Sequence, residues 1–95
     1  MIICIDIGNS NIKYAIYDGG ECRISFRVST DLKRTSDEYG AQLIEMLHIN
    51  HISVKEIRGG IISSVVPSLD YTIEHMLYIY VHIVPKQIAP GLKTG

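Results

Sequence analysis

A carboxylate, a glycine, two amides and a hydroxyl lie close together near the start of the chain, in the segment Asp6-Ile7-Gly8-Asn9-Ser10-Asn11. This segment follows an apolar run, so its carboxylate lies at the tip of an expected strand. Successive backbone N–H groups in a tight turn make a concavity that binds anions, and glycine lets a ligand come close to the backbone. A carboxylate beside phosphates suits Mg²⁺, which binds through one or two carboxylates and keeps several waters. The segment therefore fits a site for phosphate and its metal. It also fits a plain hairpin turn that carries an aspartate.

The composition describes one compact domain or part of a larger protein. The 95 residues are 46% hydrophobic with a mean hydropathy of +0.16, which is high for a free-standing domain of this size. Some apolar surface would then face a partner domain or subunit. The formal charge of −1 gives no sign of a polyanionic partner, so nucleic acid is not expected to bind.

The two cysteines and the apolar stretches bear on the cellular location. Cys4 and Cys22 form neither a CxxC pair nor a disulfide framework, and we interpret them as reduced thiols in or near the core. No basic region precedes the first strand, so no signal peptide is visible. The apolar stretch 69–84 is too short and too polar to span a bilayer. We therefore expect a soluble, cytoplasmic protein without a membrane partner.

The first third of the chain predicts three antiparallel strands. Residues 2–7 are nearly all apolar, as expected of a central strand covered on both faces. Residues 12–18 alternate in polarity, and Asp18-Gly19-Gly20 is a strong hairpin signal. Residues 21–30 alternate again and place Cys22 on the apolar face.

The remaining two thirds predict two helices and two further strands. Thr35 and Glu38 are spaced as a capping box, which indicates a helix from Ser36 to about residue 50 that tolerates Gly40.

A buried strand is expected over residues 61–66, after a glycine pair. A second helix begins at Pro67, and a short strand over 83–88 is interrupted by Pro85. The order is therefore β-β-β-α-β-α-β. This α/β order with a mixed sheet matches the ribonuclease H-like domain of actin-like ATPases and kinases, in which the turn between the first two strands lies at the phosphate site.

Four separate stretches agree with one family. The sequence resembles the type III pantothenate kinases, members of the superfamily of acetate and sugar kinases, heat-shock chaperones and actin. The resemblance covers essentially the whole chain in one register. Ser10 stands where the family usually has Thr, which keeps the hydroxyl. The matching stretches are residues 5–12, 27–31 with 34–40, 61–67 and 90–95.

The resemblance implies a kinase that transfers the γ-phosphoryl group of ATP to pantothenate, the first step towards coenzyme A. Such kinases have two domains, and residues 1–95 look like the N-terminal half, an incomplete ATP phosphate-binding lobe. The family's general base lies in a Gly-Ala-Asp-Arg motif expected beyond Gly95, so no catalytic residue is assigned here, and the chain alone is expected to be inactive. The family implies ATP and Mg²⁺, a monovalent cation (K⁺ or NH₄⁺) for the full-length enzyme, and a homodimer.

By the same resemblance, Asp6 would hold Mg²⁺ or its water shell, while the turn would hold the β- and γ-phosphates. Lys13 could reach the same anions or be a solvated strand residue. Ser63 and Ser64 could face substrate or cap the turn before the second helix, and the roles of Lys93 and Thr94 stay open. The residues expected to bind the cofactor are Asp6, Ile7, Gly8, Asn9, Ser10, Asn11, Ile12 and Lys13.

Two other functions fit the same strand order. A ribonuclease H-type nuclease needs several carboxylates around two metals, and the fourth strand ends in Ser63 and Ser64, with no carboxylate to join Asp6. A non-catalytic accessory or regulatory protein of the same fold would act through an interface, and phosphate binding without turnover would support it.

Overall fold

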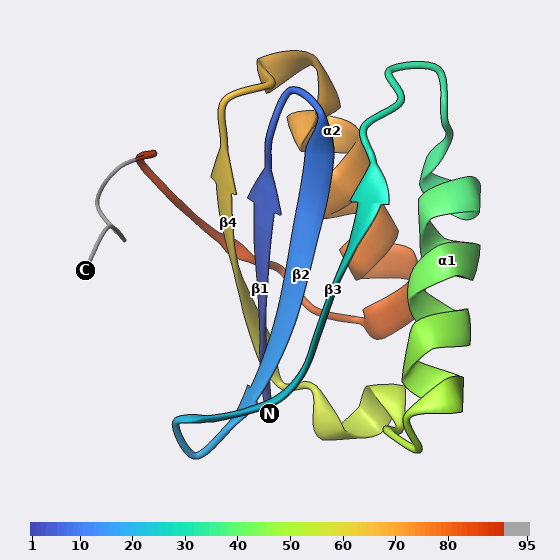
Figure 1. The fold of residues 1–95 in the computed structure, drawn as a ribbon, viewed down its shortest axis with the longest axis vertical. Coiled ribbons are helices and arrows are strands. Elements are labelled where there is room, and N and C mark those ends of the chain that lie inside the picture. Colours follow the sequence, from blue (N-terminus) through green and yellow to red (C-terminus); the bar gives the residue numbers. More distant parts are fainter. Residues whose placement is uncertain (91–95) are drawn as a thin grey trace.

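The computed structural model describes residues 1–90, in which a five-stranded mixed sheet carries two helices (Figure 1). The strand order is β3-β2-β1-β4-β5. β1 is antiparallel to β2 and parallel to β4, β2 is antiparallel to β3, and β5 extends the sheet in parallel with β4. The predicted order of elements is confirmed. The strands are β1 (Ile2–Ile7), β2 (Asn11–Asp18), β3 (Glu21–Ser29), β4 (Gly59–Ser64) and β5 (Lys86–Ile88).

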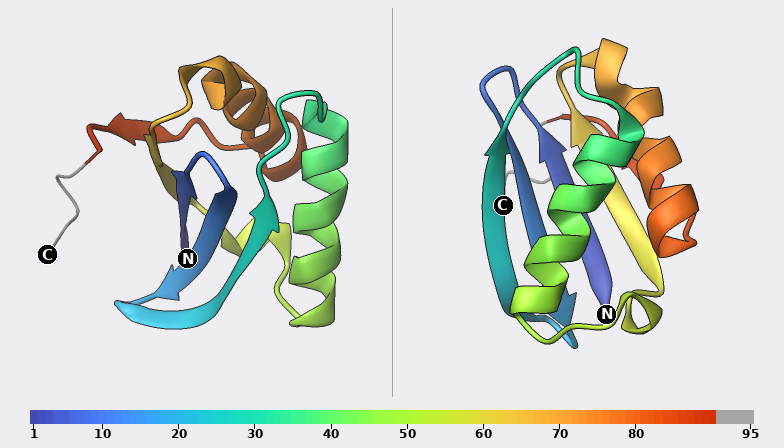
Figure 2. Two further views of the ribbon diagram at one scale, coloured as in Figure 1. Left: turned by 45° about the horizontal axis from the view of Figure 1, so that its top comes forward. Right: turned by 90° about the vertical axis from the view of Figure 1, so that its right-hand side faces the viewer.

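Both helices pack on the same face of the sheet (Figure 2). Alternation along β1 buries Ile3, Ile5 and Ile7 towards this side, whereas Cys4 and Asp6 are only partly buried. We expected β1 to be covered on both faces. In the described part of the chain that prediction is wrong, because no helix lies on the second face and Ile2 is 41% exposed.

The hairpin between β2 and β3 forms as predicted. Gly19 and Gly20 both have positive φ angles (59° and 88°), which a two-residue hairpin turn of this hand requires. The register shifts by one residue just before Tyr17, which pairs with Cys22. This irregularity leaves Cys22 exposed, so its placement in the core was wrong, and Cys4 is partly buried.

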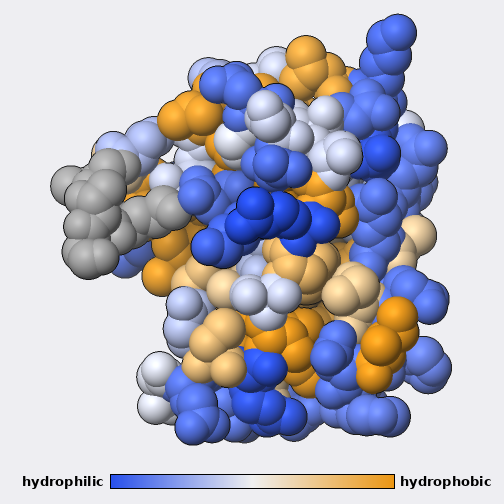
Figure 3. All heavy atoms as spheres, viewed as in Figure 1, coloured by the Kyte–Doolittle hydropathy of each residue, from blue (hydrophilic) through white to orange (hydrophobic). Residues whose placement is uncertain are grey.

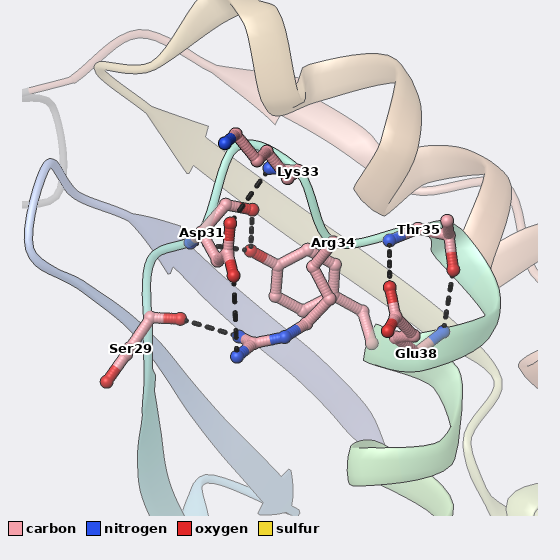
Figure 4. Close-up of polar contacts among 7 residues, drawn as sticks. Ser29, Asp31, Lys33, Arg34, Thr35 and Glu38 are labelled. Atoms are coloured by element: carbon pink, nitrogen blue, oxygen red, sulfur yellow. Dashed lines mark hydrogen bonds and ion pairs between the residues drawn. The ribbon is translucent and has the colours of Figure 1, made fainter.

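Helix α1 (Ser36–Ile49) begins with the predicted capping box. The Glu38 N–H donates to the Thr35 hydroxyl (3.2 Å), and the Thr35 N–H donates to the Glu38 carboxylate (2.8 Å) (Figure 4). Gly40 is buried and faces the ring of Tyr80.

The segments after α1 differ from expectation mainly at their ends. A 3₁₀ turn, η1 (Val54–Glu56), precedes β4, which begins at the glycine pair and ends two residues earlier than predicted. Helix α2 (Pro67–Met76) begins at Pro67 as expected and continues into a π-helical turn, η2 (Leu77–Val81). β5 forms only after Pro85. No helix within residues 1–90 is long and apolar enough to cross a membrane.

Candidate functional site

The turn between β1 and β2 is tight and closed by a backbone hydrogen bond. Ile7 and Ile12 are the last paired residues of the two strands, and the Gly8 N–H donates to the Asn11 carbonyl across the turn (2.9 Å). A Cβ on residue 8 would lie 3.0 Å from that same carbonyl oxygen, which explains the glycine. The three polar side chains that follow, Asn9, Ser10 and Asn11, are exposed.

Some predicted site residues of this turn offer hydrogen-bond donors to a ligand, whereas others have side chains buried in the core. The N–H groups of Asn9 and Ser10 have no hydrogen-bond partner among the described residues, whereas the Gly8 N–H is used within the turn. Ile7 and Ile12 are fully buried, so their side chains belong to the core and only their backbone can face a ligand. The turn therefore offers a small group of backbone donors and polar side chains at its tip.

Asp6, Lys13 and Ser63 are brought together on the face of the sheet that the helices leave uncovered. In the register of β1 with its two neighbours, Asp6 is paired with Lys13 on one side and with Ser63 on the other. Directly paired residues project from the same face of a sheet. All three line a hollow of about 400 Å³. The remaining lining residues are Cys4, Ile5, Ala15, Tyr17, Ile61 and Ile88.

This uncovered face mixes charge with apolar surface. Seen from the side away from the helices, hydrophobic residues gather over the middle of the sheet, with hydrophilic residues between them (Figure 3). Lys13 is exposed, Asp6 is partly buried, and Ser63 is only 3% exposed. A carboxylate, an ammonium group and a hydroxyl thus share one hollow beside the turn, an arrangement that can hold a hydrated cation together with an anion.

Known proteins resemble this chain in both sequence and fold. The family model for type III pantothenate kinase matches residues 2–95. The chain belongs to the type III pantothenate kinase family. A type III pantothenate kinase of Geobacillus thermodenitrificans is 41% identical over 95 residues, which are 100% of this chain and 37% of that relative. The chain therefore spans little more than a third of the length of this curated relative.

Solved structures share the fold of this family member at low sequence identity. A Porphyromonas gingivalis protein assigned as an N-acetylglucosamine kinase superimposes with a TM-score of 0.65 at 19% identity, over 94% of this chain and 34% of that one. YeaZ from Pseudomonas aeruginosa gives a TM-score of 0.63 at 5% identity, over 93% and 43%. At such identities the likeness shows the fold alone. It confirms the predicted ribonuclease H-like (actin-like ATPase) fold.

The structure separates the two serines at the end of β4 of this family member. The Ser64 hydroxyl accepts a hydrogen bond from the Val66 N–H (3.0 Å), so Ser64 caps the turn into α2. Ser63 instead points into the hollow beside Asp6. The capping interpretation therefore holds for Ser64, and the site interpretation is retained for Ser63.

Sequence reasoning gave no role to Thr30, although it lies in one of the stretches that carry the resemblance. The Thr30 hydroxyl donates to the Gly8 carbonyl (2.7 Å), and its N–H donates to the Ser10 carbonyl (2.9 Å). A threonine at the end of an alternating strand is ordinary in sequence, so nothing in the pattern predicts that it will bind a distant turn. Only the pairing of β2 with β3 brings it to the turn.

The single carboxylate at this site, Asp6, suits Mg²⁺ better than a metal ion that is held entirely by protein side chains. Within residues 1–90, no three His, Cys, Asp or Glu side chains converge as metal ligands. Mg²⁺ needs only one or two carboxylates when phosphate oxygens and waters complete its shell. Lys93 and Thr94 lie outside the described residues.

Proposed function

We propose that this chain provides the phosphate-binding lobe of a two-domain kinase that transfers the γ-phosphoryl group of ATP to pantothenate, forming 4′-phosphopantothenate. Family membership supports the reaction, and the site supports the part that these residues play in it. Phosphoryl transfer depends on positioning and on neutralising charge that spreads over the transferred group. Both tasks suit a turn rich in N–H donors beside a carboxylate and an ammonium group.

Each residue of the site has a distinct proposed role. Asp6 holds Mg²⁺ or one of its waters, and the bound ion would neutralise charge on the β- and γ-phosphates. The turn from Gly8 to Asn11 donates backbone and side-chain hydrogen bonds to the same phosphates. Lys13, which pairs directly with Asp6 on the neighbouring strand, attracts the anion. The Ser63 hydroxyl contacts the Asp6 carboxylate or a metal-bound water.

The observation that carries this proposal is the register of β1 with its two neighbours. It places Asp6 beside Lys13, on the two strands that the turn joins, and beside Ser63 on the neighbouring strand β4. Ser63 occupies the position from which a second carboxylate would complete a two-metal nuclease site. That position favours a kinase over a nuclease.

The proposal is tested by titrating the ¹⁵N-labelled chain with Mg²⁺ and AMP-PNP, a non-hydrolysable ATP analogue. We expect the largest amide shifts at Asn9, Ser10 and Asn11, and at least tenfold weaker Mg²⁺-dependent binding in Asp6→Asn. The matched control is Asp18→Asn, which neutralises an exposed carboxylate at the opposite end of β2 and should bind like the wild type. Equal affinity for Asp6→Asn and wild type, or shifts confined to another surface, would contradict the proposal.

The reaction, its partners and its cofactors reach beyond these 95 residues. We propose ATP and pantothenate as substrates, a monovalent cation (K⁺ or NH₄⁺) for the longer enzyme, a homodimer and a cytoplasmic location. The general base is expected in a segment after residue 95. The isolated chain should therefore bind Mg²⁺ with AMP-PNP but form no phosphopantothenate. Product formation by these 95 residues would place the base within them.

A further inference from the structure

Thr30 uses both of its hydrogen-bond donors on the turn between β1 and β2. It follows directly after β3, and its hydroxyl and its N–H bind the carbonyl groups of Gly8 and Ser10, respectively (2.7 and 2.9 Å). Two alternate carbonyl groups of a four-residue turn are therefore held by a single residue. No other residue in the described part of the chain donates to these two carbonyl groups.

These two contacts also set the direction of the next N–H groups. No peptide bond in the described chain is cis, and in a planar trans peptide the carbonyl and the following N–H point in opposite directions. The Gly8 carbonyl points to Thr30, so the Asn9 N–H points away from Thr30. By the same argument, the Ser10 carbonyl holds the Asn11 N–H away from Thr30, on the strand edge where the Asn11 carbonyl accepts the Gly8 N–H. Of these two donors, it is therefore the Asn9 N–H that the Thr30 contacts turn towards the open side of the turn.

The residues on either side of Thr30, Ser29 and Asp31, are held by helix α1 and the loop before it (Figure 4). On one side, Arg34 donates to the Ser29 carbonyl (2.9 Å). On the other, the hydroxyl of Tyr39 donates to the Asp31 carbonyl (2.8 Å) and accepts from the Asp31 N–H (3.0 Å). The Arg34 guanidinium also lies over the Tyr39 ring, 5.2 Å from its centroid.

The anchor of this support is rigid. Tyr39 is fully buried in the first turn of α1, so the backbone around Thr30 is fixed to the core. A flexible loop could not orient the turn, because the peptide groups in contact with it would move with the loop. The buried anchor makes Thr30 suited to preorganising a binding site rather than only closing a loop.

We infer that Thr30 is a positioning residue of the phosphate site, which aims the Asn9 N–H group at the bound phosphates and fixes the turn around it. The inference rests on the proposed phosphate-binding function and adds a residue to it that touches no ligand. Donors aimed before binding cost no reorganisation when the anion arrives, which is the source of their value. Removing the hydroxyl should therefore weaken phosphate binding more than it weakens the fold.

The test compares Thr30→Val, which keeps the shape and the backbone N–H but loses the hydroxyl, with Thr30→Ser, which keeps the hydroxyl. The matched control is Ser36→Ala. Its hydroxyl donates to the Thr72 carbonyl at 2.8 Å, a similar partly buried bond that joins α1 to α2. Each variant of the 95-residue chain is titrated with Mg²⁺ and AMP-PNP while the turn amides are followed by ¹⁵N NMR. Urea unfolding gives the stability of each.

We expect the Kd to rise about five- to tenfold in Thr30→Val, from the loss of one hydrogen bond, and to stay within twofold in Thr30→Ser and Ser36→Ala. Thr30→Val and Ser36→Ala should lose similar stability, so that stability alone cannot explain the difference in Kd. Equal Kd values for Thr30→Val and the wild type would overturn the inference, as would an equal rise in Ser36→Ala.

Two outcomes remain to be separated. If Thr30→Val gives no folded spectrum, Thr30→Ala replaces it, since it also keeps the N–H and adds no branched methyl groups. If the wild-type turn amides do not respond to Mg²⁺ and AMP-PNP, the proposed phosphate site itself fails before any variant is compared, and the role of Thr30 falls with it. A responding wild type with an unaffected Thr30→Val refutes only the role of Thr30.

Discussion

Replacing Gly40 by alanine tests the packing of α1 against η2, with two opposing effects of known size. Alanine in place of glycine in a helix interior stabilises by about 1 kcal/mol. The added Cβ, however, would lie 2.5 and 2.7 Å from the Cδ2 and Cε2 atoms of Tyr80. Contacts this short force the ring to move, and overpacking of this kind costs about 1–3 kcal/mol.

The ring of Tyr80 cannot move freely, which favours the larger cost. Its hydroxyl donates to the carboxylate of Asp37 (2.5 Å), and its backbone belongs to the π-helical turn η2. We therefore expect Gly40→Ala to lower the free energy of unfolding by about 1 kcal/mol net, the difference between overpacking and helix propensity. In a domain of this size, that lowers the Tm by about 4–8 °C.

A double-mutant cycle with Tyr80→Ala separates the two effects. Without the ring, only the helix propensity remains, so Gly40→Ala should raise the free energy of unfolding by about 1 kcal/mol in that background. Urea unfolding followed by circular dichroism measures all four proteins. The same sign in both backgrounds would refute the reasoning, as would stabilisation of the wild type by Gly40→Ala.

Three further predictions follow from single side chains. The Tyr14 hydroxyl is buried without a hydrogen-bond partner in the described residues, so Tyr14→Phe should raise the stability at pH 7 by about 1 kcal/mol. Burial, together with the nearby Tyr39, raises the pKa of Tyr14 above its usual value of about 10, so above pH 10 the unfolded chain loses this phenol proton more readily than the folded chain, and the protein becomes less stable as the pH rises. The urea midpoint should therefore fall less steeply above pH 10 in Tyr14→Phe than in the wild type, and parallel curves would contradict this. Lys13→Met should raise the Kd for Mg²⁺ and AMP-PNP at least threefold. Arg27, which pairs with Lys13 from the neighbouring strand β3, lies further from the site, so Arg27→Met should raise the Kd less. Equal effects of the two substitutions would indicate general charge attraction instead. Exposed Cys22 should react with iodoacetamide in the native chain faster than partly buried Cys4, a difference that mass spectrometry detects and that should disappear in urea.

The elements whose signals are local were predictable from the sequence. The capping box at Thr35 and Glu38, the diglycine hairpin and the alternation of β2 depend on residues near in sequence, and all three appear where expected. The turn at Gly8 was also found, because glycine and amides mark a turn whatever surrounds it.

What the sequence did not reveal has a different cause, which is contact between distant segments. Cys22 was placed on the apolar face because alternation was continued through a register irregularity that only the pairing of β2 with β3 reveals. The helix tolerates Gly40 as predicted, but the side chain that explains this glycine, Tyr80, lies 40 residues away. Thr30 received no role because its hydrogen bonds reach back 22 residues to Gly8.

The alternation of side chains along β1 builds the core on one face of the sheet and places the polar site residues on the other. This explains why a carboxylate can stand in so apolar a strand. Ile3, Ile5 and Ile7 of β1 alternate towards the helices, so Asp6 must face the opposite side. The same parity puts Lys13 and Ser63 on that side, since each pairs directly with Asp6. A register slip of one residue in β1 would bury the carboxylate and expose three isoleucines. The free energy gained by burying these isoleucines therefore also keeps Asp6 beside the turn. In this fold, the energy that specifies the register is the energy that keeps the proposed metal ligand in place.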